Sequence, residues 1–129
     1  MSQENVDRAL QAVDAFNRRD LDSVLALVDR EVEFMVVAPD GPYYGHDGVR
    51  KWWRDLLDTI PDFRVEVVEI RDLGDWILGV ARIRGHGGDS DVPFDETNWQ
   101  IGEWRHGKCR RWRTCRSEAE ALEAAGLSE

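Results

Sequence analysis

The stretch DFRVEVVEIRDLGDWILGVARIRGHG, Asp62–Gly87, decides the fold because it reads as two long strands joined by a Gly-Asp turn. Apolar side chains alternate up to Val67 and then change phase at Val68. A change of phase within a strand indicates a β-bulge, which bends the sheet. One face of the second strand consists of small residues around Gly79, so that a helix or a ligand can approach it closely.

The segments around this hairpin predict helices before it and strands after it. Helices are predicted at residues 3–18, 21–29 and 47–59, and strands at residues 31–37, 94–104 and 109–115. Asp20 and Ser117 are predicted N-caps, the latter of a short last helix. This order predicts an α+β fold with a curved, mostly antiparallel sheet wrapped around about three N-terminal helices, as a cone-shaped α+β barrel with a short C-terminal helix. The wide end of such a cone is a natural pocket.

Composition limits the kinds of partner. With 129 residues, 42% hydrophobic and 33% charged, the chain is globular and fits a single domain, residues 1–129. A net charge of −9 argues against a nucleic-acid partner, since phosphates must be met by Lys and Arg. No apolar run is long enough to cross a membrane, and the polar N-terminus is unlike a secretory signal.

The two cysteines, Cys109 and Cys115, lie six residues apart in a predicted strand, too far for a disulfide. Free thiols indicate a cytoplasmic protein. The chain shows no paired Cys/His spacing, so no metal is expected.

Aromatic side chains are concentrated in GPYYGHDGVRKWWRDLL, Gly41–Leu57. Trp53 falls on the apolar stripe of the predicted helix, whereas Trp52 is offset by about 100° and is expected to face solvent or a partner. Tyr43 and Tyr44 point in opposite directions if extended, so that one faces inward. We expect Trp53 and one tyrosine, assigned as Tyr44, to line a pocket; the alternative is a core tryptophan and a surface tyrosine.

Polar side chains on the later strands are candidates for chemistry. Asn98 and Gln100 share one face of their strand and are polar handles in the pocket if that face is concave, or ordinary surface if it is convex. Asp95 and Glu96 straddle the two faces, and either can serve as a general base if burial raises its pKa. Arg84, or Arg82 on the same face, can pair with that carboxylate or with a substrate anion, as the alternative to plain solvent exposure.

Several segments together resemble the SnoaL-like branch of the nuclear transport factor two-like superfamily. They are AFNRRDLDSVLALVDREVEF (15–34), YYGHDGVRKWW (43–53), the Gly107-Lys108 hairpin and EALEAAGL (120–127). The resemblance covers roughly residues 6–127. It implies a cone-shaped cavity, frequent homodimers, and one of several cofactor-independent activities or plain ligand binding. The activities include polyketide cyclisation, ketosteroid isomerisation, epoxide hydrolysis and dehydration.

The same resemblance bears on individual pocket residues. Ketosteroid isomerase-like members use a tyrosine on the first helix as oxyanion donor, where this chain has Phe16. They carry an aspartate base near the first strand, where this chain reads Phe34-Met35 instead of an aspartate. Phe16 and Phe34 are accordingly expected to line the pocket. Trp112 is expected to stack over the cavity or over the first predicted helix, and it is assigned as a ligand-binding residue with them.

Three functions follow as hypotheses. The first is a cofactor-free acid–base enzyme (cyclase, isomerase, dehydratase or hydrolase) acting on a small apolar or polyketide-like compound through Asp95, Glu96 and Arg84. It requires a carboxylate within hydrogen-bond reach of a second polar group in the pocket. The second is a non-catalytic protein that binds a small apolar organic ligand. The third is an interaction module with a filled interior. A homodimer through the sheet is expected, with no nucleic-acid or membrane partner.

Overall fold

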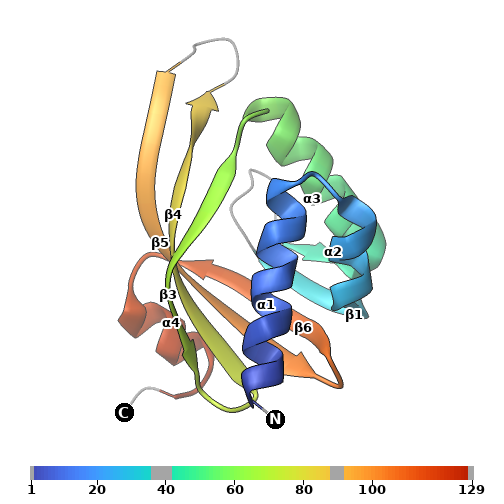
Figure 1. The fold of residues 1–129 in the computed structure, drawn as a ribbon, viewed down its shortest axis with the longest axis vertical. Helices are drawn as coiled ribbons and strands as arrows, with labels where there is room; N and C mark the ends of the chain where they lie inside the picture. The colour runs from blue at the N-terminus through green and yellow to red at the C-terminus, as the bar shows by residue number, and fades with distance from the viewer. Residues whose placement is uncertain (1, 36–41, 88–91, 128–129) are drawn as a thin grey trace.

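The computed structural model describes residues 2–35, 42–87 and 92–127, and within these ranges it contains four helices and one six-stranded sheet (Figure 1). The helices are α1 (Ser2–Asn17), α2 (Leu21–Leu27), α3 (Gly45–Thr59) and α4 (Glu118–Ala124). The strands are β1 (Val28–Met35), β2 (Tyr43–Tyr44), β3 (Arg64–Asp72), β4 (Trp76–Gly87), β5 (Val92–Arg105) and β6 (Lys108–Cys115). The predicted α+β class is confirmed. Val36 and Val37, predicted to extend the first strand, lie outside the described residues.

The sheet is mixed and open. Its strand order is β2-β1-β6-β5-β4-β3, with β1 and β6 parallel and every other neighbouring pair antiparallel. The first strand of the described residues therefore pairs with the last one. Among the residues that the structure describes, β2 and β3 are the two edges of the sheet, so the cone is a bent open sheet rather than a complete barrel.

A bulge in β3 bends the sheet where the change of phase predicts it. Val67 lies opposite Ala81 on β4, and the next pair begins at Glu69, so Val68 is skipped in the pairing. Val68 is also strongly exposed. A bulge of this kind increases the local twist and bends the strand. β3 and β4 consequently curve around α1 (Figure 1).

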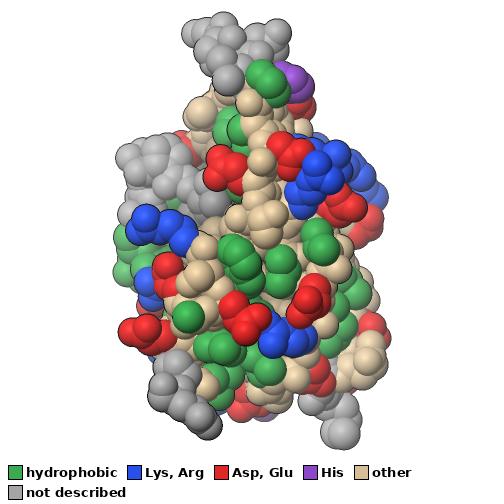
Figure 2. Space-filling model, turned by 90° about the vertical axis from the view of Figure 1, so that its left-hand side faces the viewer, with side chains coloured by type: hydrophobic (Ala, Val, Ile, Leu, Met, Phe, Trp, Pro, Cys, Tyr) green, Lys and Arg blue, Asp and Glu red, His purple; other side chains and the backbone are tan. Residues whose placement is uncertain are grey.

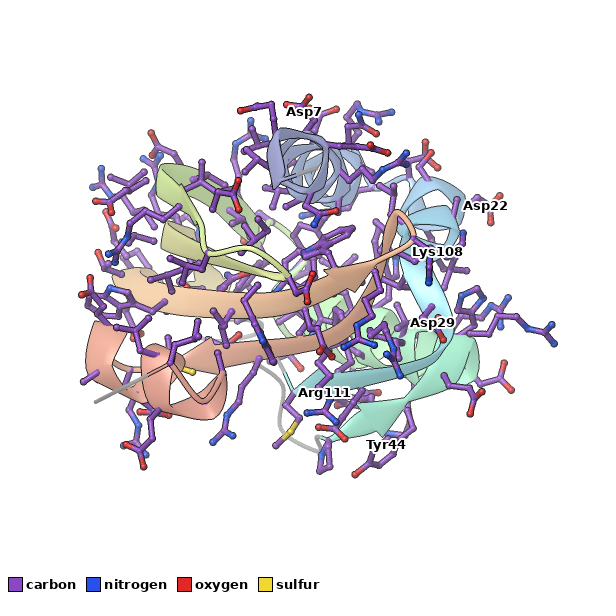
Figure 3. All side chains as sticks on the ribbon, turned by 90° about the horizontal axis from the view of Figure 1, so that it is seen from below. Asp7, Asp22, Asp29, Tyr44, Lys108 and Arg111 are labelled. Atoms are coloured by element: carbon purple, nitrogen blue, oxygen red, sulfur yellow. The ribbon has the colours of Figure 1, made fainter. Side chains whose placement is uncertain are left out.

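The helices cover both faces of the sheet, but unequally. α1, α2 and α3 pack on the concave face, where the main core includes Phe16, Trp52, Trp104 and Cys109. α4 lies on the opposite face, as the view from below shows (Figure 3). There it covers a second, smaller cluster: Leu78, Ile101, Cys115 and Ala121. Both cysteines are buried and free, one in each cluster, as expected from their spacing.

Helix ends follow the predicted capping. The Asp20 carboxylate accepts a hydrogen bond from the Ser23 backbone N–H at 3.1 Å, and the Ser117 hydroxyl accepts one from Glu120 N–H at 3.1 Å. Each bond satisfies a first-turn N–H that has no acceptor within its helix. Among the described residues, no helix is both long enough and apolar enough to span a membrane.

Candidate functional site

Two adjoining hollows lie between α1 and the concave face of the sheet. The larger has a volume of about 60 Å³ and the smaller about 40 Å³. They share four wall residues: Val13, Val65, Gln100 and Trp112. A cavity needs roughly 10–15 Å³ to hold one water molecule, so each hollow exceeds that minimum. Together the hollows form one elongated site along the inner face of the sheet.

Aromatic and small side chains build the walls. Phe16 from α1, Trp52 from α3 and Phe34 from β1 line the larger hollow. The rings of Phe34 and Trp52 meet edge to face with centroids 4.7 Å apart, which fixes both against each other. The smaller hollow lies against Gly79 of β4. The small-residue face predicted for this strand is therefore the inner one.

A line of three polar side chains crosses this apolar wall. The indole N–H of Trp112 donates to Gln100 Oε1 at 2.9 Å, and Gln100 Nε2 donates to Asn98 Oδ1 at 3.2 Å. Asn98 and Gln100 are paired with Ala81 and Gly79 of β4, and directly paired residues share one face of a sheet. The two amides therefore point inward, where the small side chains of β4 leave room for them. Of the two facings left open by the sequence, the structure has the concave one.

Two residues that line the larger hollow each carry a buried polar atom with no hydrogen-bond partner among the described residues. The atoms are Nδ2 of Asn98, a side chain that is 7% exposed, and Oγ1 of Thr114. A buried donor without a partner costs about 1–3 kcal/mol, so such atoms are rare in folded proteins. The hollow thus combines apolar walls with unused hydrogen-bonding capacity at one place.

The residues expected to carry acid–base chemistry lie elsewhere. Asp95 is on the outer face, where the Arg82 guanidinium binds it through two bonds of 2.7 and 2.5 Å. Arg84 points to the same side and pairs with Glu66 at 2.9 Å. Strand alternation is the reason. Asp95 lies three positions before the inward-facing Asn98 and therefore on the opposite face, and Arg84 is paired with Asp95 across the sheet. The expectation that Asp95 and Arg84 point into the pocket is wrong.

Electrostatics also disfavours Asp95 as a base. Its hydrogen bond with Arg82 lowers the pKa of the Asp95 carboxyl, whereas a general base near neutral pH needs a raised one. Acidic and basic side chains also lie beside one another on the side of the molecule that carries β5 and α4 (Figure 2). Glu96 is in phase with Asn98 but exposed, and it is not part of either wall.

Among the expected aromatic wall residues, Phe16, Phe34 and Trp112 line the larger hollow, but Tyr44 and Trp53 do not. Tyr44 is 62% exposed and points away from the sheet (Figure 3). Trp53 is half-buried beside α1, and its neighbour Trp52 occupies the wall. The assigned facing of the two tryptophans is therefore wrong. The spacing Val49–Trp52–Leu56 would have identified the buried stripe, since all three are buried.

The inward tyrosine is Tyr43. It is buried and its hydroxyl donates to Asp55 Oδ2 at 3.2 Å. Thr114 is a further wall residue that was not predicted, although it lies two positions after Trp112 on β6 and so shares its face. No Asp, Glu, His, Lys or Arg belongs to the described walls of either hollow. In the part of the chain that the structure describes, no group of three or more His, Cys, Asp or Glu could hold a metal ion.

Comparison with known proteins links this geometry to a family. The family model of the SnoaL-like domain matches residues 9–112. No curated protein sequence matches the chain. Among solved structures, an NTF2-like protein of unknown function from Burkholderia pseudomallei is similar, with a TM-score of 0.80 and 22% identity over 93% of this chain and 95% of that one.

Two further structures have the same fold. TerC, co-crystallised with polyporic acid, has a TM-score of 0.80 and 17% identity, covering 93% of this chain and 98% of its own. IdmH from Streptomyces antibioticus, a proposed polyketide cyclase, has a TM-score of 0.75 and 20% identity, covering 95% of this chain and 98% of its own. At these identities the likeness shows the fold alone.

Proposed function

Because the chain belongs to the SnoaL-like domain family through its match over residues 9–112, we propose that it binds one small, uncharged, mostly apolar organic molecule in the joined hollows beneath α1. The observation that carries the proposal is a hollow with aromatic walls and a few convergent polar atoms. Small-molecule sites are commonly built in this way. TerC, which has this fold, was co-crystallised with polyporic acid, and that supports a small organic ligand for this chain.

Size and charge define the ligand further. With volumes of about 60 and 40 Å³, the joined hollows limit the ligand to a small molecule of about one ring. A charged group is disfavoured, because the described walls offer no opposite charge and burying an unpaired ion is costly.

Binding is favoured over acid–base catalysis. Cyclisation, isomerisation, dehydration or hydrolysis by the expected route needs a carboxylate beside a second polar group in the pocket. Asp95 and Arg84 are instead engaged in ion pairs on the outer face. The homodimer through the sheet, the single domain and the cytoplasmic location are not needed for this proposal and stay predictions.

The test uses two uncharged probes of nearly equal shape, acetophenone and α-methylstyrene, with binding followed by ligand-observed NMR and calorimetry. For ligands of this size we expect dissociation constants of about 1 mM or below. Benzoate, the charged probe, should bind the wild type at least about tenfold more weakly than acetophenone, because its carboxylate would be buried without a partner. Equal binding of benzoate would contradict an uncharged ligand.

Matched variants locate the site. Val13→Phe fills the shared wall of both hollows, whereas Val68→Phe makes the same change at the exposed bulge of β3. Val13→Phe should weaken both neutral probes at least about tenfold, and Val68→Phe should leave them unchanged. Thermal unfolding of both variants controls for loss of fold. Failure of both neutral probes to bind the wild type, or equal binding by a folded Val13→Phe protein, would overturn the proposal.

A further inference from the structure

The hydrogen bonds among Trp112, Gln100 and Asn98 leave a donor group at the polar end of the larger hollow. The indole of Trp112 can only donate, so the Gln100 group that meets it must be the carbonyl oxygen. The amide nitrogen of Gln100 then faces Asn98 and fixes Oδ1 as the atom that accepts from it. Asn98 Nδ2 is what remains, a buried N–H donor at the end of the line with no partner among the described residues.

Thr114 adds a second group at the same place. Its Oγ1 is buried, has no partner in the described part of the chain, and belongs to the same wall as Asn98. Thr114 lies opposite Gln100 in the pairing of β5 with β6, so it is the diagonal neighbour of Asn98 on the inner face. Diagonal neighbours have Cβ atoms roughly 7–8 Å apart, a separation that one oxygen atom can bridge by accepting from both groups.

The rest of the wall sets the remaining chemistry. The side-chain oxygens of Asn98 and Gln100 already accept hydrogen bonds from the chain, so the polar end chiefly presents donors. Beyond Val13 and Val65 the site continues into the smaller hollow, whose described wall is apolar apart from Gln100 and the Trp104 and Trp112 indoles. A ligand that fits has a hydrogen-bond-accepting oxygen at one end and an apolar body at the other.

We infer that Asn98 Nδ2 and the Thr114 hydroxyl anchor the oxygen of a neutral carbonyl compound, a ketone or an aldehyde, whose apolar body extends along α1 towards Gly79. This inference rests on the proposed function and names the ligand class of the same site. A carbonyl oxygen has two lone pairs and no proton, so it matches two donors and requires no acceptor from the wall. A hydrocarbon of the same shape leaves both donors unpaired.

The decisive measurement compares acetophenone with α-methylstyrene, which differ by C=O against C=CH₂. Their hydration in water differs, so their affinities in one protein are not comparable directly. The ratio of the two dissociation constants is therefore measured in the wild type and again in Asn98→Leu, and the change of that ratio cancels the hydration difference. We expect the preference for the ketone to fall at least about tenfold in Asn98→Leu, and by about threefold or more in Thr114→Val.

A second readout needs no variant. In wild-type protein labelled with ¹⁵N, acetophenone should move the side-chain NH₂ resonances of Asn98 downfield, and α-methylstyrene should not. This measurement keeps the test valid if Asn98→Leu does not fold. Thr114→Val is nearly isosteric, so it controls for changes of shape.

The outcomes separate the two proposals. If neither probe binds the wild type, the proposed function fails. If both bind but their affinity ratio is the same in the wild type, Asn98→Leu and Thr114→Val, the hollow is a ligand site and the carbonyl anchor is wrong. An Asn98 side-chain resonance that responds equally to both probes overturns the anchor in the same way, since it then reports filling of the site and not a hydrogen bond.

Discussion

Asn17 takes the place of a neighbouring strand at Val65. Its side-chain Nδ2 donates to Val65 O at 2.8 Å, and its Oδ1 accepts from Val65 N–H at 3.0 Å. β3 is the last strand of the sheet, so these backbone groups would otherwise lie open at its edge. The last residue of α1 thereby ties the helix to the strand that walls both hollows.

Replacing Asn17 should loosen that attachment. Asn17→Ala removes both hydrogen bonds, and we expect the free energy of unfolding to fall by about 1–3 kcal/mol. It also opens a strand edge, so light scattering on heating should increase. Chemical denaturation measures the first effect, with Gln11→Ala at an exposed position of the same helix as control. Equal stability of the two variants would contradict the edge role of Asn17.

The two adjacent tryptophans should differ sharply. Trp52 is 8% exposed and packs against Phe34 and Phe16, with ring centroids 4.7 and 5.6 Å away. Trp52→Ala should cost about 3–5 kcal/mol of stability, as expected for a buried aromatic residue. Trp53→Ala should cost about 1–2 kcal/mol, because that side chain is only half-buried. Urea unfolding measures the stability of both variants. A larger loss of stability in Trp53→Ala than in Trp52→Ala would contradict the assignment of Trp52 as the buried tryptophan.

Two glycines of β4 provide another matched pair. A Cβ atom at Gly85 would lie 2.6 Å from Ile60 Cγ2, at the end of α3, and 3.2 Å from a ring carbon of Phe94. Gly85→Ala should therefore destabilise the protein by about 1–3 kcal/mol. At Gly79 the nearest atom to such a Cβ would be 3.9 Å away. Gly79→Ala should be neutral or stabilise by up to about 1 kcal/mol. Thermal melts with similar midpoints for the two variants would refute the close packing at Gly85.

Asp20, the N-cap of α2, should make the folding stability depend on pH in the acidic range. Hydrogen bonds from the Ser23 hydroxyl and backbone N–H lower the pKa of the Asp20 carboxyl from its ordinary 3.8. A lowered pKa in the folded state means that the carboxylate stabilises the fold above pH about 3.8 and that this contribution is lost as the pH falls through the folded-state pKa.

Two variants isolate this effect in melting curves between pH 7 and pH 2. Asp20→Ala should melt lower than the wild type at pH 7, and the difference should shrink below pH about 4. Asp20→Asn keeps a capping oxygen without the titrating proton, so it should retain part of the stability with less pH dependence. A wild-type advantage over Asp20→Ala that persists at pH 2 would argue against a charged cap.

The sequence allowed the frame of the fold to be predicted, because its signals are local. The change of phase at Val68 identified the bulge, and the small residues around Gly79 identified the inner face of β4. The facing of Asn98 could not be derived in the same way, since both faces of β5 carry apolar residues. It depends on which face the helices cover, which is a tertiary property.

The candidate site was predicted less well for similar reasons. Charged residues on a strand next to an inward polar pair suggested a catalytic group, yet a shift of one position places Asp95 on the outside with Arg82. Trp52 and Trp53 differ by about 100° around α3, and the apolar stripe was drawn through the wrong one. In both cases a shift of one residue along the chain separates a side chain in the pocket wall from one outside it.

The alkylation rates of the two thiols should report how fast different parts of the protein open. Burial raises the pKa of both Cys109 and Cys115, so neither is reactive as a thiolate while the fold is intact. Cys115 sits beneath α4, and Cys109 lies in the main core on the other side of the sheet. An alkylating reagent should therefore label Cys115 at the rate at which α4 detaches, and Cys109 only when the whole sheet comes apart.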